Sequence, residues 1–321
     1  MTRRSCPYCY CINVTKHGKT HGRQRYECQD CYTTWSNLPR SETRTRKLWR
    51  EYAVQGASVA TLAERHRKSS STIRRILETY SVENWIVRPR TVTVILDVTY
   101  FRGFGVLVAY DPYAKETKGY ESVLYYSVLT STEKTVDYDI ATDTMESIGY
   151  RIQAVVIDGR RGVREMLLAK GIPVQHCQFH QLQTITQCLT KRPKLPQNQE
   201  LRAIACTLTK TTKPAFEARL DEWYGIHGTW LKERYTDPLT GRTRYRHDRT
   251  RRAYFSLRRN LDYLFTCRDE TYAKQGIRIP NTTNPLDGQF GVWKKRINKH
   301  PGASKQRIIT MLRSFFSGGT D

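Results

Sequence analysis

Residues 91–100 read TVTVILDVTY, an apolar and β-branched stretch that is typical of a buried strand. This stretch contains an aspartate, Asp97. A second apolar stretch, IQAVVIDG at 152–159, carries Asp158 near its end. A carboxylate on a buried strand is energetically costly unless it is paired or binds a metal. We therefore expect two strands that bring two acids to one site.

The sequence around these two strands predicts an α/β domain. Further strands are expected at 105–112, 120–129 and 172–177, and helices at 131–149 and 160–171. The resulting order, β-β-β-α-β-α-β, is that of a ribonuclease H-like core. In a sheet of this kind the first strand lies beside the fourth, so the two acids come close together.

A third acid, Asp287, lies in NTTNPLDG (281–288), where a helix is expected to begin at Asn284 or Pro285. Carboxylates suit Mg²⁺ or Mn²⁺, and two such ions about 4 Å apart can activate a nucleophile and stabilise a leaving oxygen. Other acids fall in a turn or on an acid-rich helix and are interpreted as solvated or capping residues: Asp111, Asp137, Asp139, Asp143 and Glu146. The predicted catalytic acids and magnesium ligands are Asp97, Asp158 and Asp287.

The composition favours a nucleic-acid partner. The chain has 321 residues and a formal net charge of +24, with 54 Lys and Arg against 30 Asp and Glu. Such a balance attracts polyanions, and nucleic acid is a better candidate than an anionic membrane because no long basic amphipathic helix is evident. We find no apolar run of about 18 residues and no signal peptide. We therefore expect an intracellular protein, cytoplasmic and nucleoid-associated, without a membrane partner.

Cysteine pairs dominate the N-terminal segment, residues 1–40. Cys6-x2-Cys9 and Cys28-x2-Cys31 have the spacing of a zinc ribbon with one structural Zn²⁺. The stretches 23–28 and 32–35 read as its two short strands. Cys11, His17 and His21 compete as ligands, and Cys11 fits the pair spacing poorly. Because so short a segment can form only a small apolar core of its own, metal binding would supply much of its folding free energy.

Residues 41–87 predict a helix-turn-helix. Helices are expected at 41–54, 58–66 and 71–80, with Ser residues as caps. The last of them would enter the major groove of DNA. Its expected contact residues are Ser70, Ser71, Thr72, Arg74 and Arg75. The alternative is a helical linker with solvated charges.

The strand pattern stops after the segment 88–180, and residues 181–279 read as a basic helical insertion. The stretch 242–259, RTRYRHDRTRRAYFSLRR, combines arginines with aromatic residues, as expected for a surface that binds phosphates; a solvated helix is the alternative. Residues 280–321 are expected to form two C-terminal helices of the ribonuclease H-like core, the second at 304–316. Further candidates for DNA contact are Arg160, Arg161, Arg244, Arg246, Arg251, Arg252, Lys294 and Lys295.

One small motif, Cys177-x2-His180, stands just before the insertion. Two ligands do not make a zinc site. A structural role for Cys177 and His180, which would fix the start of the inserted helices, is the preferred interpretation.

These motifs together resemble the DDE transposases of the bacterial Mutator-like insertion-sequence family, in the variant with an N-terminal zinc-binding segment. The resemblance covers most of the chain, from the zinc ribbon to the NTTNPLDG block. It implies a ribonuclease H-like catalytic core interrupted by an all-helical insertion. It also implies magnesium-dependent cleavage at element ends, giving a 3′-hydroxyl that attacks target DNA. The implied partners are double-stranded DNA with terminal inverted repeats and further copies of the chain, as a homodimer or higher multimer in a prokaryotic cell.

The chain departs from the family at its third acid, which is usually glutamate where Asp287 stands. Aspartate is shorter by one carbon–carbon bond, about 1.5 Å. A misplacement of about 1 Å can reduce a rate by roughly 100-fold. A domesticated or inactive copy that only binds DNA is therefore the first alternative. A ribonuclease H-like nuclease for branched DNA or RNA is the second, although it does not account for the ribbon and helix-turn-helix.

Overall fold

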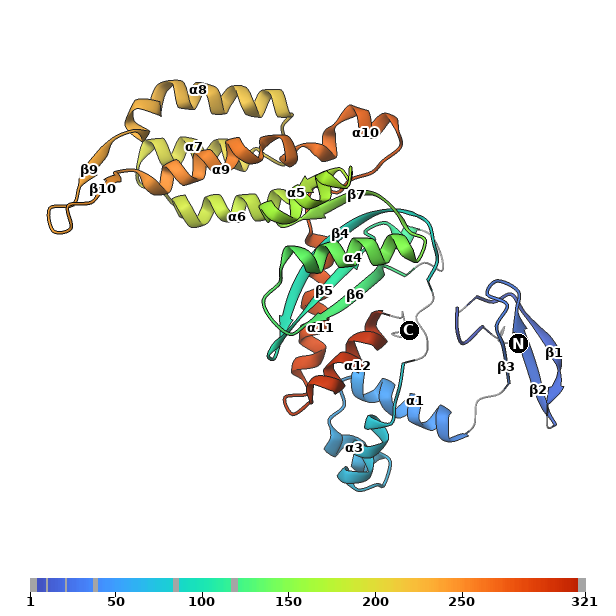
Figure 1. The fold of residues 1–321 in the computed structure, drawn as a ribbon. Helices are drawn as coiled ribbons and strands as arrows, with labels where there is room; N and C mark the ends of the chain where they lie inside the picture. The colour runs from blue at the N-terminus through green and yellow to red at the C-terminus, as the bar shows by residue number, and fades with distance from the viewer. Residues whose placement is uncertain are drawn as a thin grey trace.

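The computed structural model describes residues 5–9, 11–20, 22–36, 40–82, 87–116 and 121–316. From the N-terminus, a small antiparallel sheet and three helices precede an α/β domain, and a bundle of helices projects from that domain (Figure 1). Within the described residues, none of the helices combines the length and the apolar character that crossing a membrane requires.

A mixed five-stranded sheet forms the centre of the α/β domain. Its strands are β4 (Thr91–Phe101), β5 (Phe104–Tyr110), β6 (Val123–Leu129), β7 (Arg151–Ile157) and β8 (Val174–His176), in the order β6-β5-β4-β7-β8. The first three strands pair antiparallel, whereas β7 runs parallel to both β4 and β8. The predicted contact between the first and fourth strands is confirmed, with Ile95 opposite Val156.

Helices cover both faces of the sheet, because side chains alternate along each strand. Leu96 and Val155 belong to the apolar cluster that includes residues of α4 (Thr135–Ser147) and α5 (Arg161–Ala169). Ile95 and Val156 belong to the opposite cluster, which includes α11 and α12. The last two helices are α11 (Asn284–Asn298) and α12 (Lys305–Phe316). The first strand of the α/β domain, β4, and the last two helices, α11 and α12, therefore contribute to the same apolar cluster.

Three N-terminal helices pack against the same apolar cluster as α12. They are α1 (Arg40–Ala53), α2 (Val59–Arg65) and α3 (Ser70–Glu78), and Ser58 and Ser69 cap the second and third by accepting backbone hydrogen bonds. The Trp49 indole donates a hydrogen bond to the Ser314 hydroxyl at 2.8 Å. These helices are therefore part of the core, and α1 lies beside α12 (Figure 1).

The bundle between β8 and α11 is built from α6 (Gln178–Leu189), α7 (Pro196–Cys206), α8 (Lys213–Leu231), α9 (Asp248–Leu264) and the short α10 (Glu270–Lys274). Two short 3₁₀ turns, η1 (Ala114–Glu116) and η2 (Thr266–Arg268), complete the described helical elements. Phe216, Leu220 and Leu257 are among the fully buried residues of the bundle's own apolar cluster. The bundle thus has a core separate from the sheet.

The expected all-helical insertion is wrong in one respect, because a β-hairpin joins α8 to α9. Strands β9 (Arg234–Thr236) and β10 (Thr243–Tyr245) pair antiparallel. The turn between them is set by Asp237, whose carboxylate accepts the Leu239 amide hydrogen at 2.9 Å, and by Gly241 at φ +64°. Glycine adopts this left-handed conformation without the steric penalty of other residues.

The N-terminal sheet has three strands, one more than expected: β1 (Val14–Thr20), β2 (Arg23–Cys28) and β3 (Thr34–Ser36). The additional strand is polar and almost entirely exposed. It carries no apolar alternation, which explains why its sequence did not predict a strand.

Candidate active site and metal centre

Asp97 is held inside the sheet on β4, where its carboxylate accepts the Val98 amide hydrogen at 2.7 Å. Burial, together with the negative charges of Asp158 and Asp287, raises the pKa of Asp97 to about 7, against the opposing effects of the Val98 hydrogen bond and His180. Asp158 and Asp287 are therefore both close enough to Asp97 to interact electrostatically with it. Electrostatic coupling of this kind is common at functional sites.

Asp158 directly follows β7 and is oriented by its own loop. Its carboxylate accepts the Arg160 amide hydrogen at 3.4 Å, and the Arg160 Nε lies 3.8 Å from Asp158 Oδ2. The Arg160 guanidinium also forms an ion pair with Glu133. Arg160, predicted to contact DNA, here joins two carboxylates within the site.

Glu133 is a fourth acid at this site that the sequence did not indicate. Its side chain is 9% exposed, and it accepts a hydrogen bond from the Tyr138 hydroxyl at 2.7 Å. Burial raises the pKa of Tyr138, as do the charges of Glu133, Asp158 and Asp97. Glu133 precedes α4 and has neither a strand nor a motif around it, so only its place after the third strand could have marked it.

Asp287 lies in the first turn of α11 and is positioned by the preceding residues. The Thr283 hydroxyl donates a hydrogen bond to Asp287 Oδ2 at 2.9 Å and lies 3.4 Å from His180 Nδ1. The Thr283 amide donates to the Cys177 Sγ at 3.3 Å. The Cys177-x2-His180 motif and the NTTNPLDG block are thus in direct contact.

Cys177 and His180 form a polar pair at the start of α6. Burial acts to raise the pKa of the Cys177 thiol, but hydrogen bonds with His180 and Thr283 outweigh it and lower that pKa. The hydrogen bond with Cys177, together with the charges of Cys177, Asp97 and Asp287, raises the pKa of His180 to about 9 against the effect of burial. A protonated His180 would therefore face the acids and offset part of their mutual repulsion.

The three predicted acids are less tightly grouped than the four cysteines of the N-terminal segment. Among the residues that the structure describes, the one group of metal-ligand side chains whose donor atoms all lie within 4.8 Å of one another is formed by cysteines. The three carboxylates do not form a group of this kind. Their oxygen donors nevertheless match the preference of Mg²⁺, which retains several waters and takes few protein ligands.

The cysteine group is the one predicted: Cys6, Cys9, Cys28 and Cys31. The Sγ atoms of Cys6 and Cys31 are 3.7 Å apart, and those of Cys9 and Cys28 are 3.3 Å apart. Tetrahedral zinc with bonds of about 2.3 Å to sulfur accommodates such separations. These four residues could bind a structural zinc ion.

The competing ligands lie at different distances from the cysteine group. The Cys11 Sγ is 3.0 Å from the Cys28 Sγ, closer than its poor spacing had indicated. Burial would raise the pKa of Cys28, but hydrogen bonds, that of Cys11 foremost, lower it to about 6. His17 instead lies 3.2 Å from a Glu27 carboxylate oxygen, and His21 is outside the described residues.

The predicted DNA-contact residues fall on several surfaces. On α3, Ser71, Arg74 and Arg75 are exposed, whereas Ile73 and Leu77 are buried. Ser70 and Thr72 at its start are half-buried. The outward face of α3 is therefore polar and basic, as a recognition helix requires.

Several other candidates already have partners in the protein. Arg161 forms an ion pair with Glu165, and Arg252 forms one with Asp248. Arg251 stacks on Tyr245. Lys295 is exposed and Lys294 half-buried on α11, and Arg244 and Arg246 are exposed beside the β9–β10 hairpin.

Comparison with protein-family models finds no match to this chain, and comparison with curated protein sequences finds none either. The functional interpretation therefore rests on the chain's own residues.

Proposed function

We propose that this protein is a DNA transposase with a ribonuclease H-like catalytic core. The observation that carries the proposal is the convergence of three acids from separate parts of the chain. Asp97 lies on β4, Asp158 follows β7, and Asp287 lies in the first turn of α11, and the charges of Asp158 and Asp287 both act on Asp97. The strand order β6-β5-β4-β7-β8, with three antiparallel strands followed by two parallel ones, supports the ribonuclease H-like assignment.

The acid site suits Mg²⁺ or Mn²⁺, in a pair of ions. A divalent cation would relieve the repulsion that contributes to the raised pKa of Asp97. When bound, such ions activate the attacking oxygen and stabilise the leaving one. The chain contributes fixed carboxylates, with Asp97 anchored by the Val98 amide and Asp287 by the Thr283 hydroxyl.

The remaining parts support action on long DNA. The basic face of α3 is suited to the major groove of terminal inverted repeats, and the net charge of +24 favours binding of target DNA as well. Strand transfer by the released 3′-hydroxyl needs two element ends in one complex. The active form is accordingly a homodimer or higher multimer on DNA.

The proposal is tested with purified protein, Mg²⁺ and a DNA fragment that carries the repeats flanking the gene. The wild type should nick the element ends, and Asp97→Asn should bind the same DNA without cutting it. Loss of cutting in EDTA and its return with Mg²⁺ would show the metal requirement. If both proteins bind equally and neither cuts, the enzyme proposal is wrong.

A second candidate, a DNA-binding protein derived from a transposase, is favoured by two observations. Among the described residues, the three carboxylates are not part of a close group of metal-ligand side chains, and aspartate rather than glutamate stands at position 287. Asp287→Glu distinguishes the two. A working but under-reaching site should cut faster with the longer side chain, whereas a relic should remain inactive with either residue.

A further inference from the structure

The β9–β10 hairpin is a polar ribbon that projects from the helical bundle. It lies at the end of the bundle opposite α10, away from the five-stranded sheet (Figure 1). Its strands are exposed along almost their whole length, and Leu239 at its tip is 94% exposed. Neither the fold of the bundle nor the acid site explains such an extension.

Stacked side chains brace the hairpin against α8 and α9. The Tyr245 ring lies between the guanidinium groups of Arg234 and Arg251, at 4.7 and 4.0 Å from its centre. At the base, His247 stacks on Trp230 with ring centres 3.6 Å apart and contacts the Glu233 carboxylate at 3.1 Å. Because the ribbon is already held in place, little conformational entropy would be lost when it binds a partner.

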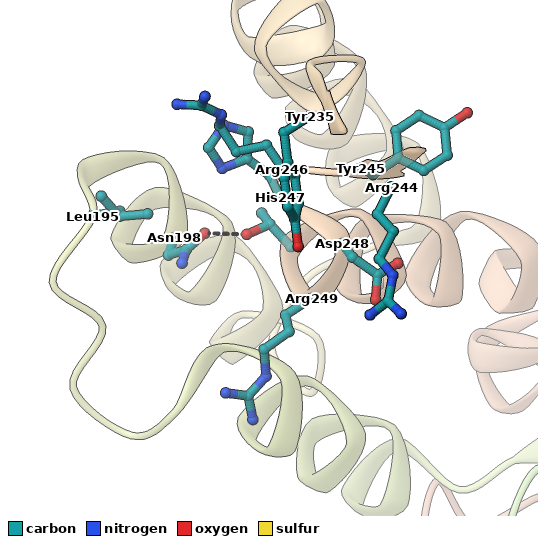
Figure 2. Close-up of a pocket in the computed structure, with 10 residues that line it drawn as sticks. Leu195, Asn198, Tyr235, Arg244, Tyr245, Arg246, His247, Asp248 and Arg249 are labelled. Carbon is teal, nitrogen blue, oxygen red and sulfur yellow. Dashed lines mark hydrogen bonds between the residues drawn. The ribbon is translucent and has the colours of Figure 1, made fainter. Parts of the chain in front are cut away.

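An open groove of about 630 Å³ runs along one side of the ribbon. Tyr235, Arg244 and Arg246 line it from the hairpin side, and Leu195 and Asn198 line it from α7 and the residue before it (Figure 2). The Asn198 side chain accepts a hydrogen bond from the Thr250 hydroxyl at 2.7 Å, which fixes the α7 wall against α9. The groove is thus formed by ordered elements.

Two of the three arginines that line the groove differ from their neighbours in having no internal partner, whereas the third, Arg249, donates a hydrogen bond to the Gln187 carbonyl at 3.0 Å. Arg251 and Arg252 are engaged with Tyr245 and Asp248, respectively. Arg244 and Arg246, by contrast, have no side-chain hydrogen bond or ion pair with any residue in the described ranges, and both are exposed. The two side chains extend in different directions from the ribbon (Figure 2). Each unpaired guanidinium group can donate hydrogen bonds to phosphate oxygens.

We infer that the β9–β10 hairpin and its groove bind the backbone of double-stranded DNA, at a distance from the bond that the acid site cuts. A two-stranded ribbon fits the major groove of B-form DNA, where Arg244 and Arg246 would contact phosphates along its edge. This inference rests on the proposed function, to which it adds a second DNA contact. The duplex engaged here would lie beyond the one held by α3.

The test measures binding of the full zinc-loaded chain to a duplex of about 40 base pairs, without magnesium, at several salt concentrations. The variant Arg244→Gln/Arg246→Gln is compared with Arg151→Gln/Arg219→Gln, which removes the same charge from exposed positions elsewhere. Each phosphate contact contributes about 0.9 to the slope of log K against log salt. The hairpin variant should therefore lose about 2 from that slope, and the control should match the wild type.

The expected difference is large enough to measure. Between 50 and 200 mM salt, the affinity of the hairpin variant should fall about tenfold less than that of the wild type. Equal slopes for both double variants would overturn the inference. So would a hairpin variant that loses binding to polyglutamate while retaining its affinity for DNA, because the groove would then be a site for an acidic protein.

The same variants separate this inference from the proposed function. If the hairpin variant binds as the wild type does and still cuts element ends, the hairpin inference alone is wrong. If the hairpin variant has the reduced slope but the wild type never cuts, the hairpin inference stands and the transposase proposal fails.

Discussion

Gly159, the residue after Asp158, has to be glycine for two reasons. Its φ of +100° is in the left-handed region, and a Cβ there would lie 2.3 Å from ring atoms of His176. We expect Gly159→Ala to lower the free energy of unfolding by about 3 kcal/mol, from backbone strain together with overpacking. Urea denaturation measures this loss, and any DNA cutting should fall as well because Asp158 is displaced.

Gly171→Ala is the matched control. Gly171 also has a positive φ, +75°, but a Cβ there meets nothing within 4 Å. Gly171→Ala should therefore lower the free energy of unfolding only by the backbone strain, about 1 kcal/mol. Equal losses in the two variants would contradict the steric conflict with His176.

His176 itself makes the fold sensitive to acid. Burial, together with the positive charges of Arg164 and His180, lowers its pKa from 6.5 to about 4. Below pH 6.5 the unfolded chain takes up a proton that the folded chain refuses, so stability falls as the pH drops towards 4. This group alone should remove about 2 kcal/mol between pH 7 and pH 5.

The variant His176→Gln isolates that effect from other titrating groups. Glutamine carries no charge at either pH. The difference in free energy of unfolding between the wild type and the variant should therefore change with pH. Denaturation curves at pH 7 and pH 5 supply the comparison. A difference that stays constant would show that His176 is not the residue responsible.

At the scale of elements, we expect the N-terminal ribbon to depend on a zinc ion held by its four-cysteine group. Cys28→Ser should abolish stoichiometric zinc and unfold the ribbon, since Cys28 belongs to the four-cysteine group. Cys11→Ser should keep one zinc per chain, even though its Sγ is 3.0 Å from that of Cys28. Metal analysis measures the zinc content of both variants, and circular dichroism measures the folding of the ribbon. Loss of zinc from Cys11→Ser would show that Cys11 is a ligand.

The elements also show what sequence patterns can predict. The strands with Asp97 and Asp158 could be predicted because buried strands require apolar residues, and their adjacency followed from element order. The β9–β10 hairpin could not, because three-residue exposed strands have no apolar alternation. Glu133 was missed because its ion pair with Arg160 links residues 27 apart in the sequence, and local periodicity carries no information about such a contact.

At the scale of the molecule, helices α2 and α3 and the acid-bearing helix α11 share one core. The cluster that contains Leu62, Ile73 and Leu77 of α2 and α3 also contains Leu286 of α11. The contacts continue at its edge, where His300 Nε2 lies 3.0 Å from the Tyr52 carbonyl oxygen. By contrast, the apolar cluster around the zinc cysteines includes described residues of the N-terminal sheet segment alone.

Two truncations test this arrangement. Deleting residues 1–39 should leave a chain that unfolds cooperatively within a few degrees of the wild type's midpoint. Deleting 1–87 should produce an aggregating or largely unfolded chain, because apolar residues of α12 such as Met311 and Leu312 lose their cover, at about 2 kcal/mol for each buried side chain that becomes exposed. That loss is large against a typical domain stability of about 5–15 kcal/mol.

Thermal denaturation and size-exclusion chromatography distinguish the outcomes, and Trp49→Ala provides the point-mutant equivalent. Trp49 is 2% exposed and stacks on Tyr80 with ring centres 4.6 Å apart, so its removal should lower stability by about 3–5 kcal/mol while leaving the acid site intact. A monomeric, fully stable fragment 88–321 would mean that α1–α3 form an independent module. If the fragment instead fails as expected, DNA held by α3 lies at a fixed position relative to Asp287, and the spacing between a recognised sequence and any cut is set by the fold.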